Sequence, residues 1–176
     1  SPISGHQAIL VGNLTIRKES MESLDILILG VEASIALAGF AGIIATFQFG
    51  EGKVVKRADA VGLTMILQFS LLAALMSSIA ILLNNFGVKE TTLWAMCSVV
   101  AAIMYAGGIY VQNDNLKGAV RTASGRRMVV VIQIPGVVLI LINVMNASDI
   151  FFHREAGPVI AGIVWGLTLA GFMFSR

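Results

Sequence analysis

The sequence predicts an all-α integral membrane protein, a bundle of five transmembrane helices. Its composition is the first indication: 57% of the 176 residues are hydrophobic and only 12% are charged, whereas about 25% are charged in an average soluble domain. The second indication is that apolar runs long enough to cross a bilayer recur five times. Inside hydrocarbon every backbone polar group has to be paired within the protein, which favours helices over open strands.

The segment before the first apolar run, residues 1–23, is mixed and mostly polar, with several glycine, proline and asparagine residues as breakers. Its alternating apolar residues allow a short strand or an interfacial segment. The segment is too short to cross a bilayer. We expect an extracytoplasmic N-terminal segment here. In an alternative interpretation Met21 is the natural first residue and Ser1–Ser20 is not native. Residues 24–176 are expected to form the membrane domain.

Five spans are predicted within that domain, at about 26–47, 60–83, 93–111, 128–145 and 158–175. Asp59 precedes the second span and is a good N-cap. Pro158 opens the fifth span, where a missing backbone donor does no harm. The fourth span is the least regular.

The fourth span contains Pro135, which removes one backbone donor and is expected to kink the helix close to Ile134. Gln133 and Asn143 add polar side chains to the same run. These features would also suit a re-entrant segment, which remains an alternative for this span.

The basic residues between the spans predict the orientation of the chain. Eight belong to the side expected to be cytoplasmic, namely Lys53, Lys56, Arg57, Lys117, Arg121, Arg126, Arg127 and Arg176. The opposite side has four, namely Arg17, Lys18, Lys89 and Arg154. Because Lys and Arg stay preferentially in the cytoplasm, we expect the N-terminus outside and the C-terminus inside. The expected location is a bacterial inner membrane.

Charge also limits the partners of the protein. A net charge of +2 is too small to indicate a nucleic-acid partner. The lipid bilayer is the expected partner, and the inner cluster of Lys117, Arg121, Arg126 and Arg127 is a candidate for contact with anionic lipid headgroups. In the alternative interpretation these four residues only set the topology.

Glu32 is the single charged residue between positions 26 and 47. It lies about 9 Å into the first span at the usual helical rise. An ionised carboxylate facing lipid there is costly, so we expect the side chain to face protein or water. It is therefore a candidate for handling a proton or cation, with Asn143 and Gln68 as candidate helpers if the three converge. The alternative is a protonated or paired glutamate that only fixes helix packing.

Small residues repeat every four positions in the first and fifth spans, at Gly30, Ser34, Ala38 and Gly42 and at Gly162 and Gly166. Such stripes let helix backbones approach closely, within one chain or between chains. Because five helices offer little interior for a pathway, we expect a homo-oligomer. Glu32 lies about 200° around the helix from Ser34, so the acid and this stripe occupy different faces.

Signatures of an enzyme are weak. Cys97 is the only cysteine and lies among apolar neighbours, and His6 and His153 do not have metal-ligand spacing. We therefore expect no enzymatic activity, metal or cofactor. We predict that the chain is a small homo-oligomeric membrane protein whose function is to conduct or couple a small cation or proton. The alternative is a structural or accessory subunit of a larger membrane complex.

Overall fold

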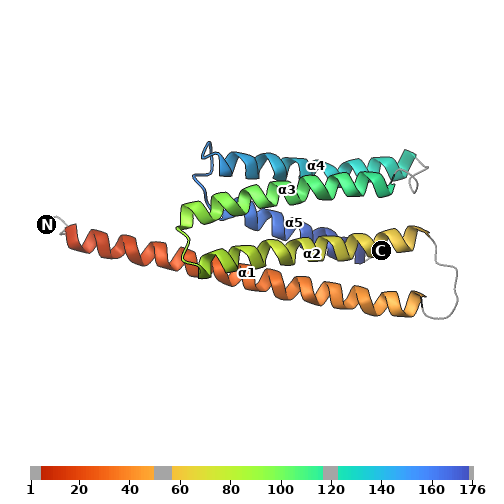
Figure 1. The fold of residues 1–176 in the computed structure, drawn as a ribbon, viewed down its shortest axis with the longest axis horizontal. Helices are drawn as coiled ribbons and strands as arrows, with labels where there is room; N and C mark the ends of the chain where they lie inside the picture. The colour runs from red at the N-terminus through yellow and green to blue at the C-terminus, as the bar shows by residue number, and fades with distance from the viewer. Residues whose placement is uncertain (1–4, 50–56, 117–122, 175–176) are drawn as a thin grey trace.

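The computed structural model describes residues 5–49, 57–116 and 123–174. These residues fold into five helices and contain no strand: α1 Gly5–Phe49, α2 Arg57–Asn85, α3 Glu90–Leu116, α4 Ala123–Ala147 and α5 Gly157–Phe174 (Figure 1). The predicted all-α class and the five helices are confirmed for this part of the chain.

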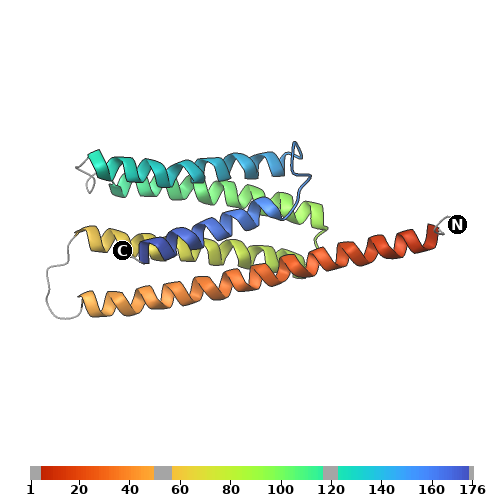
Figure 2. The same cartoon turned by 180° about the vertical axis from the view of Figure 1, so that it is seen from behind.

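The helices run up and down, and α1, α2, α3 and α4 are neighbours in chain order (Figure 1). Helix α5 contacts all four of the others and crosses one face of this row (Figure 2). We call the end that holds the α2–α3 turn and the α4–α5 loop the loop end, and the opposite end, where α5 finishes, the C-terminal end. Helix α5 is thus the common packing partner of the bundle.

Helix α1 is longer than the sequence suggested, because it begins at Gly5 and continues for 45 residues. The strand considered for the N-terminal segment is therefore wrong for residues 5–23. Once a helix exists, each further residue adds a hydrogen bond without a new nucleation cost, and one glycine costs only about 1 kcal/mol. The glycine and asparagine residues of this segment therefore do not interrupt the helix. Its first part projects beyond the bundle (Figure 2).

Among the described residues, four helical stretches are long and apolar enough to cross a bilayer, namely Glu22–Phe47, Gly62–Asn85, Glu90–Val111 and Gly157–Phe174. In α4 the described side chains begin at Gln133, and they form an apolar stretch from Gln133 to Ala147. Helix α4 nevertheless passes through Pro135 as a single helix of 25 residues. Pro135 therefore does not divide this segment into two helices.

The core lies mainly between α2, α3 and α5, where Met76, Trp94, Tyr105 and Ile163 are buried together. The Tyr105 hydroxyl of α3 donates a hydrogen bond to the backbone carbonyl of Gly162 in α5. A second, smaller cluster joins α1, α2 and α5 around Ala41, Leu63, Ile66 and Ala170. These contacts hold α5 against its neighbours along its whole length.

Candidate functional site

Glu32 lies on the side of α1 that faces away from the other helices. Its side chain is exposed and forms no hydrogen bond or ion pair within the described part of the chain. Ala36, Gly39 and Ile43 follow at spacings of four, three and four residues, and all are exposed as well. We call these four residues the Glu32 face. A side chain added at Gly39 would meet nothing within 4 Å.

Asn143 lies elsewhere, fully buried in α4. Its Nδ2 donates to the carbonyls of Leu139, at 2.9 Å, and of Pro158, at 3.3 Å, whereas its Oδ1 has no partner in the described residues. The asparagine thus ties α4 to the start of α5. Its position gives it a packing contact with no link to Glu32.

Gln68 lies in a third place, half-buried in α2. It lines a cavity of about 20 Å3 together with Tyr105, Gln133 and Trp165. Gln133 in turn donates from Nε2 to Asn113 Oδ1 at 2.7 Å. A single chain therefore does not bring Glu32, Asn143 and Gln68 together.

The small-residue stripe of α1 turns from the inside to the outside of the bundle. Gly30 and Ser34 are buried, and the Ser34 hydroxyl donates to the Gly30 carbonyl at 2.6 Å. A Cβ at Gly30 would lie 2.7 Å from Ser77 Oγ of α2. Ala38 is half-buried and Gly42 is exposed, because a four-residue step advances by 400° and the row drifts around the helix.

In α5 the small residues remain inside the bundle. A Cβ at Gly162 would lie 3.1 Å from Tyr105 Cε2, and one at Gly166 would lie 3.7 Å from the carbonyl oxygen of Phe69. Both glycines therefore permit close contact of α5 with α2 and α3.

The basic candidates for lipid contact fall largely outside the described residues. Lys117 and Arg121 lie in the 117–122 gap. Arg126 and Arg127 belong to the first turns of α4, but their side chains are outside the described part.

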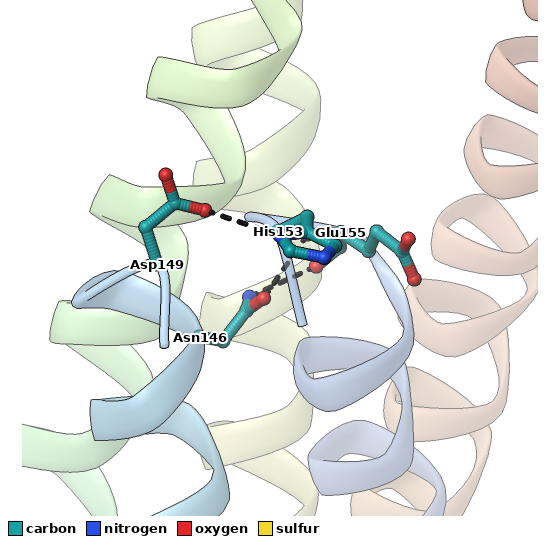
Figure 3. A network of polar contacts seen from close by, with 4 residues as sticks. All are labelled: Asn146, Asp149, His153 and Glu155. Atoms are coloured by element: carbon teal, nitrogen blue, oxygen red, sulfur yellow. Dashed lines mark hydrogen bonds and ion pairs between the residues drawn. The ribbon is translucent and has the colours of Figure 1, made fainter. Parts of the chain in front are cut away.

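The polar groups that do converge lie at the loop end, around Asn146 (Figure 3). Asn146 Nδ2 donates to Ser98 Oγ at 2.7 Å and to the Glu155 carbonyl at 2.9 Å. Its Oδ1 accepts from the Glu155 backbone N–H at 3.0 Å. One fully buried side chain thus joins α4, α3 and the loop before α5.

The α4–α5 loop held by Asn146 has an unusual backbone. Asp149, His153 and Arg154 adopt positive φ angles of 60°, 45° and 60°, which are uncommon for residues other than glycine. His153 Nδ1 lies 3.7 Å from Asp149 Oδ1, and both side chains are well exposed. The loop is therefore a defined structure fixed by side-chain contacts.

Beside this loop a groove of about 570 Å3 opens between α1, the start of α3 and residues 153–157. Its charged lining residues are Glu22, Glu90, His153, Arg154 and Glu155. The Glu155 side chain points from the loop toward α1 (Figure 3). A smaller cavity of about 60 Å3 adjoins it through Ser23, Glu90 and Trp94.

Little in the sequence alone indicates this site. Asn146 lies one residue before the end of α4, and asparagine at a helix terminus is a common capping residue. That signal identifies a helix end but not a contact with Ser98 or Glu155. The groove arises from three segments that are far apart in the chain, which no local pattern reveals.

Among the described residues no group of three histidine, cysteine, aspartate or glutamate side chains is placed to hold a metal ion. Cys97 is buried. Comparison with known protein families, curated proteins and solved structures finds no match to this chain. Glu32 and the groove beside the α4–α5 loop, which we call the loop-end groove, are the candidate sites in the described residues.

Proposed function

We propose that this chain is an integral membrane protein with five spans, with its N-terminus outside and its C-terminus in the cytoplasm of a bacterial cell. Four stretches of suitable length and composition support this proposal. Large apolar side chains on the outer surface support it as well, including Leu71, Ile103 and Leu141, each more than half exposed. In water such a surface would be a liability, whereas in a bilayer it is the natural exterior.

We further propose that copies of the chain associate through the Glu32 face and that Glu32 handles a proton or small cation at their contact. The observation that carries this proposal is the outward position of an unpartnered carboxyl inside an apolar span. A carboxylate left against lipid is costly, so a neighbour has to cover it. Ala36 and Gly39 beside it are small enough to let a second helix approach closely.

We propose a second copy of the chain as the partner, because it would cover the Glu32 carboxyl and also form an ion-binding contact. Association through one shared face brings carboxyl groups of several chains together. Carboxyl oxygens gathered at such a contact can bind a proton or a small cation. The ion path in this proposal lies between chains, which agrees with the separation of Glu32, Asn143 and Gln68 within one chain.

Ion flux into proteoliposomes tests this function. The native chain is expected to carry protons or small cations, and Glu32→Gln is expected to abolish that flux. Asp25→Asn is the matched control, because it removes an exposed acid of α1 that precedes the predicted span 26–47. Unchanged flux in Glu32→Gln would remove Glu32 from the mechanism, and absence of flux in the native chain would remove transport altogether.

Cross-linking tests the contact itself. With Cys97→Ala as background, Gly39→Cys is expected to form dimers on oxidation in the membrane. Ile103→Cys, exposed on α3, is the control and is expected to stay monomeric. Equal cross-linking at both positions would show random collision and contradict a defined contact.

A structural or accessory subunit of a larger membrane complex is the second candidate function. It is favoured by the lack of a continuous polar path within the described part of one chain. Mild detergent extraction followed by mass measurement separates the two proposals. A stable complex with other proteins supports the accessory role, and a defined self-oligomer counts against it.

A further inference from the structure

The loop-end groove holds charges of both signs that are not paired with each other. Glu90, Glu155 and Arg154 all line it, yet Arg154 forms no ion pair or hydrogen bond with any described residue. Its Nε is buried without an acceptor. Arg154 is half-buried and its positive charge has no carboxylate partner among the described residues, so an anionic oxygen bound in the groove would balance it.

Trp94 adds a largely buried aromatic side chain to the same place. It is only 5% exposed and lines both the groove and the adjoining smaller cavity. Its indole N–H has no hydrogen-bond partner in the part of the chain that is described. The nitrogen is not among the fully buried unpaired atoms of the described residues, so water or a ligand can reach it.

The depth of the groove in the proposed membrane limits the class of ligand that can bind there. Three of the stretches able to span a bilayer begin at residues that line it, namely Glu22, Glu90 and Gly157. If these stretches cross the membrane as proposed above, the groove lies at the level of the lipid headgroups. Ile26, which also lines it, then lies on the acyl-chain side. Tryptophan is enriched at this level of membrane proteins.

We propose that the groove binds a group carrying both a primary ammonium and a phosphate, supplied by the headgroup of an aminophospholipid such as phosphatidylethanolamine. The ammonium donates to the carboxylates of Glu90 and Glu155, and the phosphate accepts from Arg154. The glycerol and acyl chains leave over Ile26. The proposal depends on the membrane location proposed above but not on any role of Glu32.

The dimensions agree with such a ligand. A volume of about 570 Å3 falls within the range of about 300–1,000 Å3 that is usual for small-molecule sites. The acids and His153 do not form a metal-binding group in the described structure. Carboxylates spread over α3 and the loop suit an ammonium group with several donors better than a single metal ion.

Trp94 fluorescence provides the test. In Trp165→Phe, Trp94 is the only tryptophan, and its emission is titrated in detergent with phosphatidylethanolamine or phosphatidylcholine. We expect saturable binding of phosphatidylethanolamine at least tenfold tighter than of phosphatidylcholine, whose methylated ammonium has no N–H donor. Equal affinity for the two lipids would overturn the proposal.

Variants identify the groups responsible. Adding Arg154→Gln or Glu90→Gln is expected to weaken phosphatidylethanolamine binding at least tenfold, whereas Lys89→Gln, a nearby charge that does not line the groove, is expected to leave it unchanged. Native elution volume and melting temperature are required of each variant, and Glu90→Gln decides if Arg154→Gln does not fold. Full binding by a folded Arg154→Gln or Glu90→Gln protein would contradict the proposed contacts.

Three further measurements test the source of the ligand, its independence from Glu32 and the membrane location. Free phosphoethanolamine is expected to bind at least tenfold more weakly than the lipid, and comparable binding would overturn the lipid as the source. Glu32→Gln is expected to bind phosphatidylethanolamine normally, so loss of its ion flux bears only on the proposed function. Release of the chain from membranes by alkaline carbonate would overturn the membrane location itself.

Discussion

Asn146 and Asn143 illustrate how two similar residues in one helix differ in what they contribute. Both are fully buried in α4. Asn146 uses both ends of its amide, bridging Ser98 and Glu155, whereas the oxygen of Asn143 is unpaired among the described residues. Both lie near the end of the fourth apolar run of the sequence, and no sequence pattern tells them apart, because Ser98, Glu155 and Pro158 belong to other elements.

Replacement of Asn146 is expected to destabilise the fold. Asn146→Ala leaves the fully buried Ser98 hydroxyl without this partner and also removes both bonds to the Glu155 backbone. An unsatisfied buried group costs about 1–3 kcal/mol. The free energy of unfolding in detergent is expected to fall by an amount in this range. Ser148→Ala, which removes only an exposed hydroxyl bonded to Val144 in the same helix, is the control. Equal losses would contradict the role given to Asn146.

Tyr105 is the second residue whose removal has a defined cost. Tyr105→Phe keeps the buried ring and removes only the hydroxyl that donates to the Gly162 carbonyl. Such bonds between membrane helices contribute about 0.6 kcal/mol on average, and the melting temperature is expected to fall accordingly. Tyr110→Phe removes an exposed hydroxyl of the same helix and is expected to leave it unchanged. A larger effect at Tyr110 would contradict this assignment.

At the scale of whole elements, the glycines of α1 and α3 predict opposite responses to one added methyl group. In Gly30→Ala the new Cβ lies 2.7 Å from Ser77 Oγ and 3.2 Å from Ile163 Cγ2. Overpacking of this kind typically costs about 1–3 kcal/mol. In Gly107→Ala the Cβ meets nothing within 4 Å, so the helix gains about 1 kcal/mol of propensity. Thermal unfolding of the two variants is expected to shift in opposite directions.

The elements themselves could largely be predicted, because uncharged runs of about 20 residues reveal helices directly. The predicted fourth span, 128–145, lies inside α4, for example. The start of α1 could not be predicted, because isolated breakers do not show whether an established helix continues through them. The facing direction of Glu32 was also hidden, since an apolar span has no polar side to mark which face meets the bundle.

The arrangement of the whole molecule predicts which connections lie on the same side of the membrane. The α2–α3 turn and the α4–α5 loop lie at the same end of the bundle (Figure 1). Lys89→Cys and Asp149→Cys, each in a Cys97→Ala background, are therefore expected to react with an impermeant maleimide added outside intact cells. Labelling of only one position would contradict the topology of the bundle, and labelling of both only after lysis would reverse the proposed orientation.

The buried position of Asn146 has one more consequence. Together with Ala147 and Ser148 it matches the Asn-x-Ser acceptor pattern for N-linked sugars. Its amide nitrogen is, however, already shared between Ser98 and Glu155, with none of the side chain reachable from solvent. A carbohydrate on that nitrogen is incompatible with the contacts of Asn146 to Ser98 and Glu155. A chain glycosylated at this tripeptide would therefore be unable to form the native packing of α3, α4 and the α4–α5 loop.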